Sequence, residues 1–356
     1  MPRPAPPPGP APAVRTPPPA RRRGGAGRFG RVGLAAVLAL GVAGCDHATE
    51  FEGPRLTDRF GDFSVLESLA ADRQAVDFAA GESVAFSARF NKQTEWVLEI
   101  VGEQSGAVKR IEGFSNELTA ENARWNGGTT ELPLFKDEPV SASLLFPREE
   151  AGDTTRVEIA VLSPREYPGV VLADFEGGDQ IQVGNFEFEL QNSGISAEVP
   201  PAQGAGFYLL RGTEPPSGGT RNFFVGLIDI RPAGRGRVAV PTTVPEDLYF
   251  NFFLRGLGAD FTIAVVQLIA DANGTGAYEL DQDTVFPFGD LPVDFEGWRL
   301  FSKSVGELGL TQEQARDIVG VRVVLISDNN AQPATPRQVA FGIDYITFTA
   351  GGPLEL

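Results

Sequence analysis

The chain is poor in the side chains on which much protein chemistry depends. Its 356 residues include one histidine and one cysteine. The histidine, His47, lies only two positions after the cysteine, Cys45, in a polar stretch near the N-terminus. A folded Ser-His-Asp or Cys-His arrangement is therefore excluded, and so are a zinc site built from histidine or cysteine and an internal disulfide.

Basic residues are also scarce. The chain has 47 acidic residues against 30 basic ones, a net charge of -17. The lysines number only four: Lys92, Lys109, Lys136 and Lys303. Because binding to phosphates needs a basic surface, we expect no nucleic-acid partner.

Residues 1–44 have the order of an export signal. Arginines precede an apolar run at 32–45 (VGLAAVLALGVAGC), which is too short to span a bilayer as a stable helix. The final Val-Ala-Gly-Cys resembles the bacterial lipobox. The resemblance implies cleavage before Cys45 and a covalent lipid on its thiol, which would anchor the protein in the cell envelope. The alternatives are an ordinary signal peptide that ends in cysteine, or an uncleaved anchor.

The segments on either side of Cys45 have no pattern of a folded core. The proline- and arginine-rich extension within 1–44 is predicted to be disordered. Residues 45–56 form a short polar tether. We expect attachment to the outer membrane, on either its periplasmic face or its cell-surface face.

Residues 57–162 are predicted to form a small β-sandwich. Apolar and polar residues alternate with period two at 83–90 and 95–100, with further candidate strands at 141–146 and 156–161. The motifs VAFSARFNK, WVLEIVGEQSGAVKRI and ARWNGG resemble Ig-like domains of the flagellar-hook-capping type. Trp96 and Trp125 are expected to be core aromatics.

A linker at 163–169 contains two prolines and marks a domain boundary. Residues 170–350 contain about eight strand patterns, which indicate a jelly roll, and 351–356 form a tail. Candidate strands lie at 186–190, 206–211, 223–230, 248–255, 262–270, 298–302, 321–327 and 339–348. One helix is expected at 311–318, capped by Thr311. The predicted fold class is all-β.

Four motifs in this second region resemble the galactose-binding-like jelly rolls, in particular carbohydrate-binding modules. They are ADFEGG at 173–178, LYFNFFLRG at 248–256, DFEGWRLFS at 294–302 and GIDYITF at 342–348. The resemblance implies a polysaccharide or glycan ligand. It also implies a structural calcium ion, held by Glu176 near the first strand and Asp344 in the last.

The calcium prediction has physical support, since calcium prefers six to eight oxygens and an unpaired carboxylate inside an apolar strand is costly. The alternative is that Asp344 is exposed or paired with an arginine. A second acidic loop, at 271–276, has oxygen-bearing residues at spacings like those of an EF-hand loop. Its twelfth position is Gln282 instead of glutamate, and a plain turn is favoured.

The expected ligand-binding side chains alternate along 248–255. Phe250, Phe252 and Leu254 form an apolar row expected in the core, whereas Tyr249, Asn251, Phe253 and Arg255 form the opposite row. Aromatic rings beside amide and guanidinium groups suit a sugar ring, and Gln267 on the following strand is added to the set. The alternative is a solvated or domain-facing surface.

We expect a binding protein and not an enzyme. A two-carboxylate glycosidase is chemically allowed, but no strand pattern of inward carboxylates points to one. Two interpretations stay open: a lipoprotein that captures or adheres to glycans, and an accessory lipoprotein of an outer-membrane export or uptake complex that binds protein through the jelly roll.

Overall fold

The computed structural model describes residues 61–149, 155–185, 190–214, 223–234, 236–259, 261–279, 281–328 and 337–356. The predicted signal, the tether and Cys45 lie outside these residues, as does most of the predicted strand at 186–190. No helix in the described part of the chain is long and apolar enough to cross a membrane.

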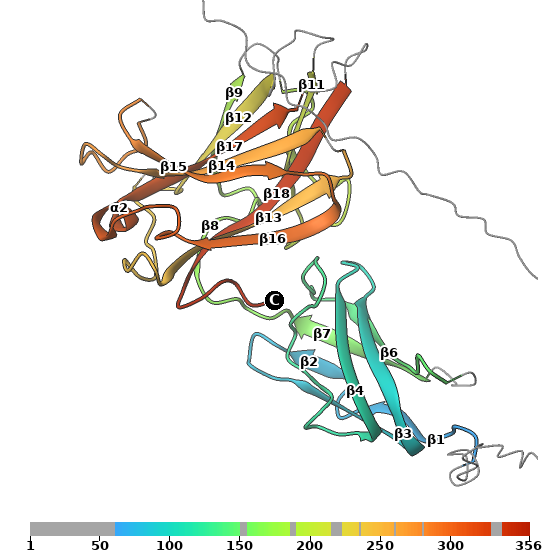
Figure 1. Cartoon of the computed structure of the whole chain (residues 1–356). Coiled ribbons are helices and arrows are strands. Elements are labelled where there is room, and N and C mark those ends of the chain that lie inside the picture. Colours follow the sequence, from blue (N-terminus) through green and yellow to red (C-terminus); the bar gives the residue numbers. More distant parts are fainter. Residues whose placement is uncertain are drawn as a thin grey trace, which may run out of the picture. The chain divides into compact units, whose positions relative to one another are not determined.

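The N-terminal strands form one hydrogen-bonded network around a core of their own (Figure 1). Trp96 and Trp125 are almost fully buried in this core, as the sequence predicted. Each indole N–H has a partner, Ser115 Oγ for Trp96 and the Gly128 carbonyl for Trp125, both at 2.9 Å. The strands are β1 (Val65–Ala71), β2 (Ala75–Asp77), β3 (Val84–Gly102), β4 (Val108–Leu118), β5 (Arg124–Trp125), β6 (Pro139–Leu145) and β7 (Thr155–Ser163).

Strand β3 joins two segments that the sequence pattern presented as separate strands. It runs for 19 residues and pairs with β4 on either side of an irregularity between Arg89 and Thr94. There the pairing moves from Glu117 opposite Arg89 to Ser115 opposite Thr94, so β3 contains extra residues. Such a bulge bends a strand and re-aims its side chains.

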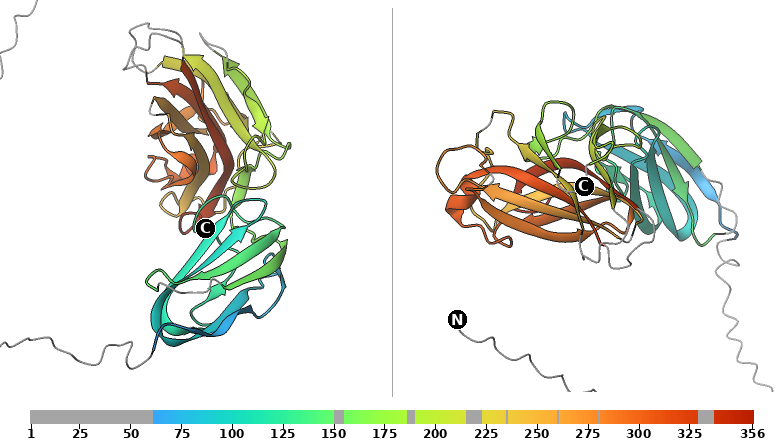
Figure 2. Two further views of the ribbon diagram at one scale, coloured as in Figure 1. Left: turned by 90° about the vertical axis from the view of Figure 1, so that its right-hand side faces the viewer. Right: turned by 90° about the horizontal axis from the view of Figure 1, so that it is seen from above.

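The C-terminal strands form two sheets. One contains β8 (Val170–Ala173), β10 (Gly194–Ser196), β11 (Phe207–Glu214), β13 (Leu248–Leu257), β16 (Glu296–Ser304) and β18 (Arg337–Ala350); we call it the β18 sheet. The other, the β17 sheet, contains β9 (Gln180–Asn185), β12 (Phe223–Arg231), β14 (Thr262–Ala270), β15 (Thr284–Pro292) and β17 (Ile318–Ser327). Figure 2 shows these strands from two further sides.

The inner faces of the two sheets share one hydrophobic core. Phe250, Phe252 and Leu254 of β13 are fully buried in it, so the predicted core row is confirmed. Successive strands from β11 to β14 alternate between the sheets. The all-β architecture of a jelly-roll sandwich follows from this arrangement.

The described residues contain one short α-helix, α2 (Gln312–Arg316), which precedes β17. Thr311 caps it as predicted, since its hydroxyl accepts from the Gln314 amide and the Gln314 side chain accepts from the Thr311 amide. This reciprocal capping box stabilises a helix too short to persist alone.

Asn251, in the middle of β13, is fully buried and connects three segments. Its amide nitrogen donates to Thr349 Oγ1 at 3.0 Å. Its oxygen accepts from Ser302 Oγ at 2.6 Å and from the Leu354 amide at 3.0 Å. The side chain therefore ties β16, β18 and the C-terminal tail together.

Replacing Asn251 with alanine should lower the free energy of unfolding by about 2–4 kcal/mol, because it leaves buried partners unsatisfied. Urea unfolding of the soluble chain measures this. Gln338→Ala, at an exposed position of β18, is the control and should change the free energy of unfolding little. Equal effects of the two substitutions would contradict the assigned role of Asn251.

Candidate functional site

The predicted calcium ligands lie close together. Asp344 of β18 is fully buried, and its carboxylate accepts from the Gln203 amide at 2.9 Å. Glu176 follows β8 and accepts from the amides of Ala205 and Gly206 at 2.7 and 3.1 Å. Both carboxylates are therefore held by the short segment 203–206.

The environment of Asp344 is unusual for a carboxylate. Burial raises its pKa well above the ordinary value, and the negative charge of Glu176 adds to this, although the backbone hydrogen bonds act in the opposite direction. No arginine or lysine is paired with Asp344 among the described residues. The alternatives of an exposed or arginine-paired Asp344 are therefore wrong.

The oxygen atoms around this pair suit a hard cation. The side-chain oxygen of Gln203 is buried and has no hydrogen-bond partner in the described structure. Gly204 packs so closely that an added Cβ would collide with the Glu176 carboxylate. No group of three or more acidic, histidine or cysteine side chains converges among the described residues. An ion here would thus take two carboxylates and complete its shell with amide or backbone oxygens.

The row predicted to bind a ligand on β13 is largely covered. Phe253 is fully buried and stacks on Tyr345, with ring centroids 5.8 Å apart, in a cluster that includes Ala202 and Leu354. Asn251 is occupied by the bonds described above. The prediction that Asn251 and Phe253 face a glycan is therefore wrong, because segments outside the β18 sheet cover its outer face.

Tyr249 and Arg255 lie at the two ends of this row and are half-buried. Burial lowers the pKa of Arg255. Trp298 is opposite Arg255 in register, packs edge-on against Phe207 at 5.3 Å and donates to the Pro200 carbonyl at 2.9 Å. A loop thus closes the Arg255 end of the face as well.

Gln267 does not adjoin the Tyr249 row. It lies on β14 in the β17 sheet, whereas Tyr249 belongs to the β18 sheet, so the predicted set is divided between the two sheets. Gln267 was added to the set because β14 follows β13 in the sequence. In the structure, β14 pairs with β15 and β17 instead.

Gln267 is part of a line of polar side chains across the outer face of the β17 sheet. In register, Gln267 is opposite Arg322, Arg322 is opposite Asp229, and Asp229 is opposite Gln182. Neighbouring strands are about 4.8 Å apart, so four strands give a line about 14 Å long. We call these four residues the polar line.

Asp229 and Arg322 form the centre of the polar line. Their side chains are 10% and 13% exposed, and the guanidinium makes two bonds to the carboxylate, at 2.7 and 2.9 Å. The Tyr278 hydroxyl also donates to Asp229, at 2.8 Å. Burial, followed by the adjacent Asp229, raises the pKa of Tyr278, so the phenol stays protonated at neutral pH.

The two ends of the polar line differ. Arg231 lies over the Tyr278 ring at 4.5 Å and donates to Gln182 at 2.5 Å. At the other end, the half-buried Gln267 amide bonds to no other described side chain. The line therefore has a rigid centre and an available amide.

An apolar strip borders the polar line on the same face. Leu227, Val265 and Val324 form its buried middle, and the exposed surface of the strip comes from the partly buried Phe224, Ile263 and Ile326 beside them. Polar groups next to an apolar surface are the combination that sugar-binding faces need.

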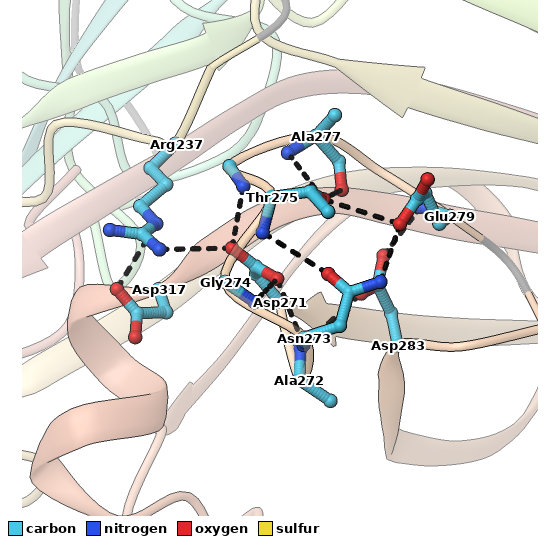
Figure 3. Close-up of polar contacts among 11 residues, drawn as sticks. Arg237, Asp271, Ala272, Asn273, Gly274, Thr275, Ala277, Glu279, Asp283 and Asp317 are labelled. Atoms are coloured by element: carbon cyan, nitrogen blue, oxygen red, sulfur yellow. Dashed lines mark hydrogen bonds and ion pairs between the residues drawn. The ribbon is translucent and has the colours of Figure 1, made fainter.

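The acidic loop after β14 is built as a turn (Figure 3). The Asp271 carboxylate accepts from the amides of Asn273, Gly274 and Gly276 and from Arg237. Asn273 donates its amide hydrogens to Glu279 and Gln282. Because these oxygens already have partners within the loop, the geometry agrees with the favoured plain turn.

Sequence reasoning missed Asp229 and Tyr278. Asp229 carried a usable signal, since it is a single acid within the apolar strand GLIDIR at 226–231, the pattern that drew attention to Asp344. Tyr278 carried none. It reaches the polar line from a loop, through a contact that depends on tertiary structure.

A scan against protein-family models finds no match, and neither does a search of curated proteins. Among solved structures, SGBP-B from a complex xyloglucan utilization locus in Bacteroides uniformis is 13% identical, with a TM-score of 0.33, and covers 81% of this chain and 73% of its own.

Two smaller structures match about half of the chain. A family 11 carbohydrate-binding module from Clostridium thermocellum, in complex with a β-1,3-1,4-mixed-linked tetrasaccharide, is 13% identical with a TM-score of 0.31 and covers 52% of this chain and 97% of its own. A family 30 module from the same organism is 13% identical with a TM-score of 0.33 and covers 51% and 98%. Similarity this low carries no argument about the ligand.

The Asp271 loop predicts a pH dependence of stability. Burial raises the pKa of Asp271, but hydrogen bonds from Arg237 and from the loop amides outweigh it and lower the pKa to about 2. The unfolded value is about 3.9. The loop's stabilisation is therefore fully present above about pH 4 and is lost as the pH falls towards about 2.

In Asp271→Asn, the free energy of unfolding should be lower at pH 6 and should fall less steeply than in the parent between pH 4 and 2. Urea unfolding at several pH values measures both. Asp281→Asn, at an exposed position of the same loop, should behave like the parent. An unchanged acid profile in Asp271→Asn would contradict the assigned pKa.

Proposed function

We propose that this chain is a non-catalytic glycan-binding protein of the cell envelope, which holds a polysaccharide along the polar line. The observation that carries the proposal is the register of Gln182, Asp229, Arg322 and Gln267 across four strands, next to an apolar strip. On the opposite sheet Asn251 and Phe253 are fully buried, whereas Gln267 of the polar line is half-buried.

The chemistry of the face suits sugar hydroxyls. The paired Asp229 and Arg322 present one acceptor and one donor in fixed positions, and Gln267 offers both. The apolar strip accepts the C–H faces of sugar rings. Asp229 and Arg322 neutralise each other, whereas Arg231 adds a positive charge at the Gln182 end of the line.

Removing polar groups from the line should weaken glycan binding. Gln267→Ala, and the double change Asp229→Asn with Arg322→Gln, should each raise the Kd at least tenfold, a loss of about 1.4 kcal/mol. The double variant replaces both partners at once and leaves no buried unpaired charge. The measurement is affinity electrophoresis and calorimetry of the lipid-free mature chain with β-glucans, xylan and galactomannan.

Tyr249→Ala and Arg255→Ala, on the β18 sheet, are the matched controls and should keep the parent affinity. Loss of binding in these two variants with none in Gln267→Ala would move the site to the β18 sheet. A folded protein that binds none of the polysaccharides would contradict the function itself.

We also propose a structural calcium ion at Glu176 and Asp344. Its support is the buried Asp344 carboxylate without a cationic partner and the orphaned Gln203 oxygen. Such an ion would join the start of the jelly roll, after β8, to its last strand.

Calcium should raise the Tm of the parent chain, and a chelator should lower it, because an ion that binds only the folded state stabilises it. Asp344→Asn and Glu176→Gln should remove this calcium dependence, whereas Asp294→Asn, at an exposed position, should retain it. Differential scanning fluorimetry measures all four proteins. If neither calcium nor the chelator changes the Tm of the parent chain, the ion is ruled out.

The envelope location is proposed from the sequence pattern that ends at Cys45. Cys45→Ser should abolish incorporation of labelled palmitate in a bacterial host and release the protein from the membrane fraction. Sucrose-gradient separation of the envelope would then assign the parent to the outer or the inner membrane. Label retained in Cys45→Ser would contradict lipidation at this residue.

A second candidate function is favoured by the apolar strip. Phe224, Ile263 and Ile326 are partly exposed on one face, and an apolar surface of this kind also suits a protein partner. In that case the chain would be an accessory lipoprotein of an outer-membrane export or uptake complex.

A further inference from the structure

The N-terminal strands form a cleft of about 570 Å³ beside the irregularity in β3. This volume lies within the range of small-molecule sites in proteins. The bulge carries Gln93 to one side of the cleft, and β4 contributes Phe114 and Asn116 from the other. The cleft therefore arises from the interrupted pairing of β3 and β4.

Phe114 dominates the surface of this cleft. It is 66% exposed, more than any other large hydrophobic side chain in the described structure. It lies opposite Glu95 in register, on the side of the ladder that faces away from the buried Trp96. A ring in this position adds nothing to the core, but it offers a flat apolar surface to a ligand.

Two amide side chains flank the ring. Gln93 and Asn116 are exposed, both line the cleft, and neither side chain bonds to another described residue. Each amide offers one acceptor and two donors. Their hydrogen-bonding capacity is therefore available to a bound molecule.

The charged groups of the cleft compensate one another. Lys92 pairs with Glu149 at 3.0 Å, with both side chains at least four-fifths buried, and Arg148 pairs with Glu95 at 2.8 Å. Thr94 donates to Glu149 at 2.9 Å and fixes it further. Since neither sign of charge is in excess, the lining does not select for an anion or a cation.

An exposed aromatic ring, free amides and a balanced charge together define the ligand class. We propose that this cleft is a second glycan site, in which one neutral sugar ring stacks on Phe114 and its hydroxyls bond to Gln93 and Asn116. It takes its ligand class from the proposed function but is independent of the polar line.

The test is an NMR titration of the lipid-free mature chain with cello-, xylo- and mannohexaose. The readout is the side-chain amide signals of Gln93, Asn116 and Gln267, each assigned from its alanine variant. Saturable shifts of the Gln93 and Asn116 signals with one of these sugars are expected. They should vanish in Phe114→Ala, persist in Phe114→Trp, which keeps a ring, and persist in Leu162→Ala, an exposed apolar control on the same sandwich.

The outcomes separate the two sites. Shifts at Gln267 with none at Gln93 and Asn116 would overturn the second site and leave the proposed function intact. Shifts at Gln93 and Asn116 that survive Gln267→Ala would establish the cleft as an independent site. No shift at any of the three amides would overturn both the second site and the proposed function. A Phe114-dependent response to an apolar peptide, with no response to any sugar, would also overturn both.

Discussion

The arrangement of this protein depends on one constraint: β18 is buried on both faces along almost its whole length. Its inner side packs in the jelly-roll core, and its outer side is covered at Asp344, Thr347 and Thr349. The polar groups on that outer side therefore need hydrogen-bond partners within the protein. Asn251 forms hydrogen bonds with the tail and with two strands. The amides of the segment 203–206 donate hydrogen bonds to Glu176 and Asp344.

On the outer face of the β17 sheet, Gln267, Ile263 and Ile326 are partly exposed. Its polar line is held by an ion pair that would be costly to bury without compensation. The bidentate contact of Arg322 and the Tyr278 hydroxyl supply that compensation. A preformed line of this kind loses little side-chain entropy on binding, which favours affinity for an extended ligand.

The sequence allowed many of the strands and the buried row of β13 to be predicted, because alternation with period two separates the two faces of a strand. It missed others, among them β1, β4, β9 and β15. It did not indicate to which sheet each strand belongs. In a jelly roll the chain crosses between sheets, so β13 and β14 are neighbours in sequence but not in pairing. Gln267 was for this reason grouped with the wrong row.

Burial of the Tyr249 row was likewise beyond the reach of a local pattern. Asn251 and Phe253 alternate with core residues as solvent-facing residues would, and only distant segments around Ala202 and Leu354 cover them. Glu176 and Asp344, by contrast, were found from short motifs at the two ends of the domain, and the structure brings them together. The cleft at Phe114 depends on a strand irregularity that no local pattern marks.

Hydroxyl-radical footprinting with and without a bound polysaccharide would show which sheet binds the ligand, because it reports the exposure of individual side chains. We predict reduced oxidation of Phe224, Ile263 and Ile326 on the outer face of the β17 sheet, with Tyr249 and Trp298 unchanged. Protection of Tyr249 and Trp298 with no change on the β17 sheet would contradict it.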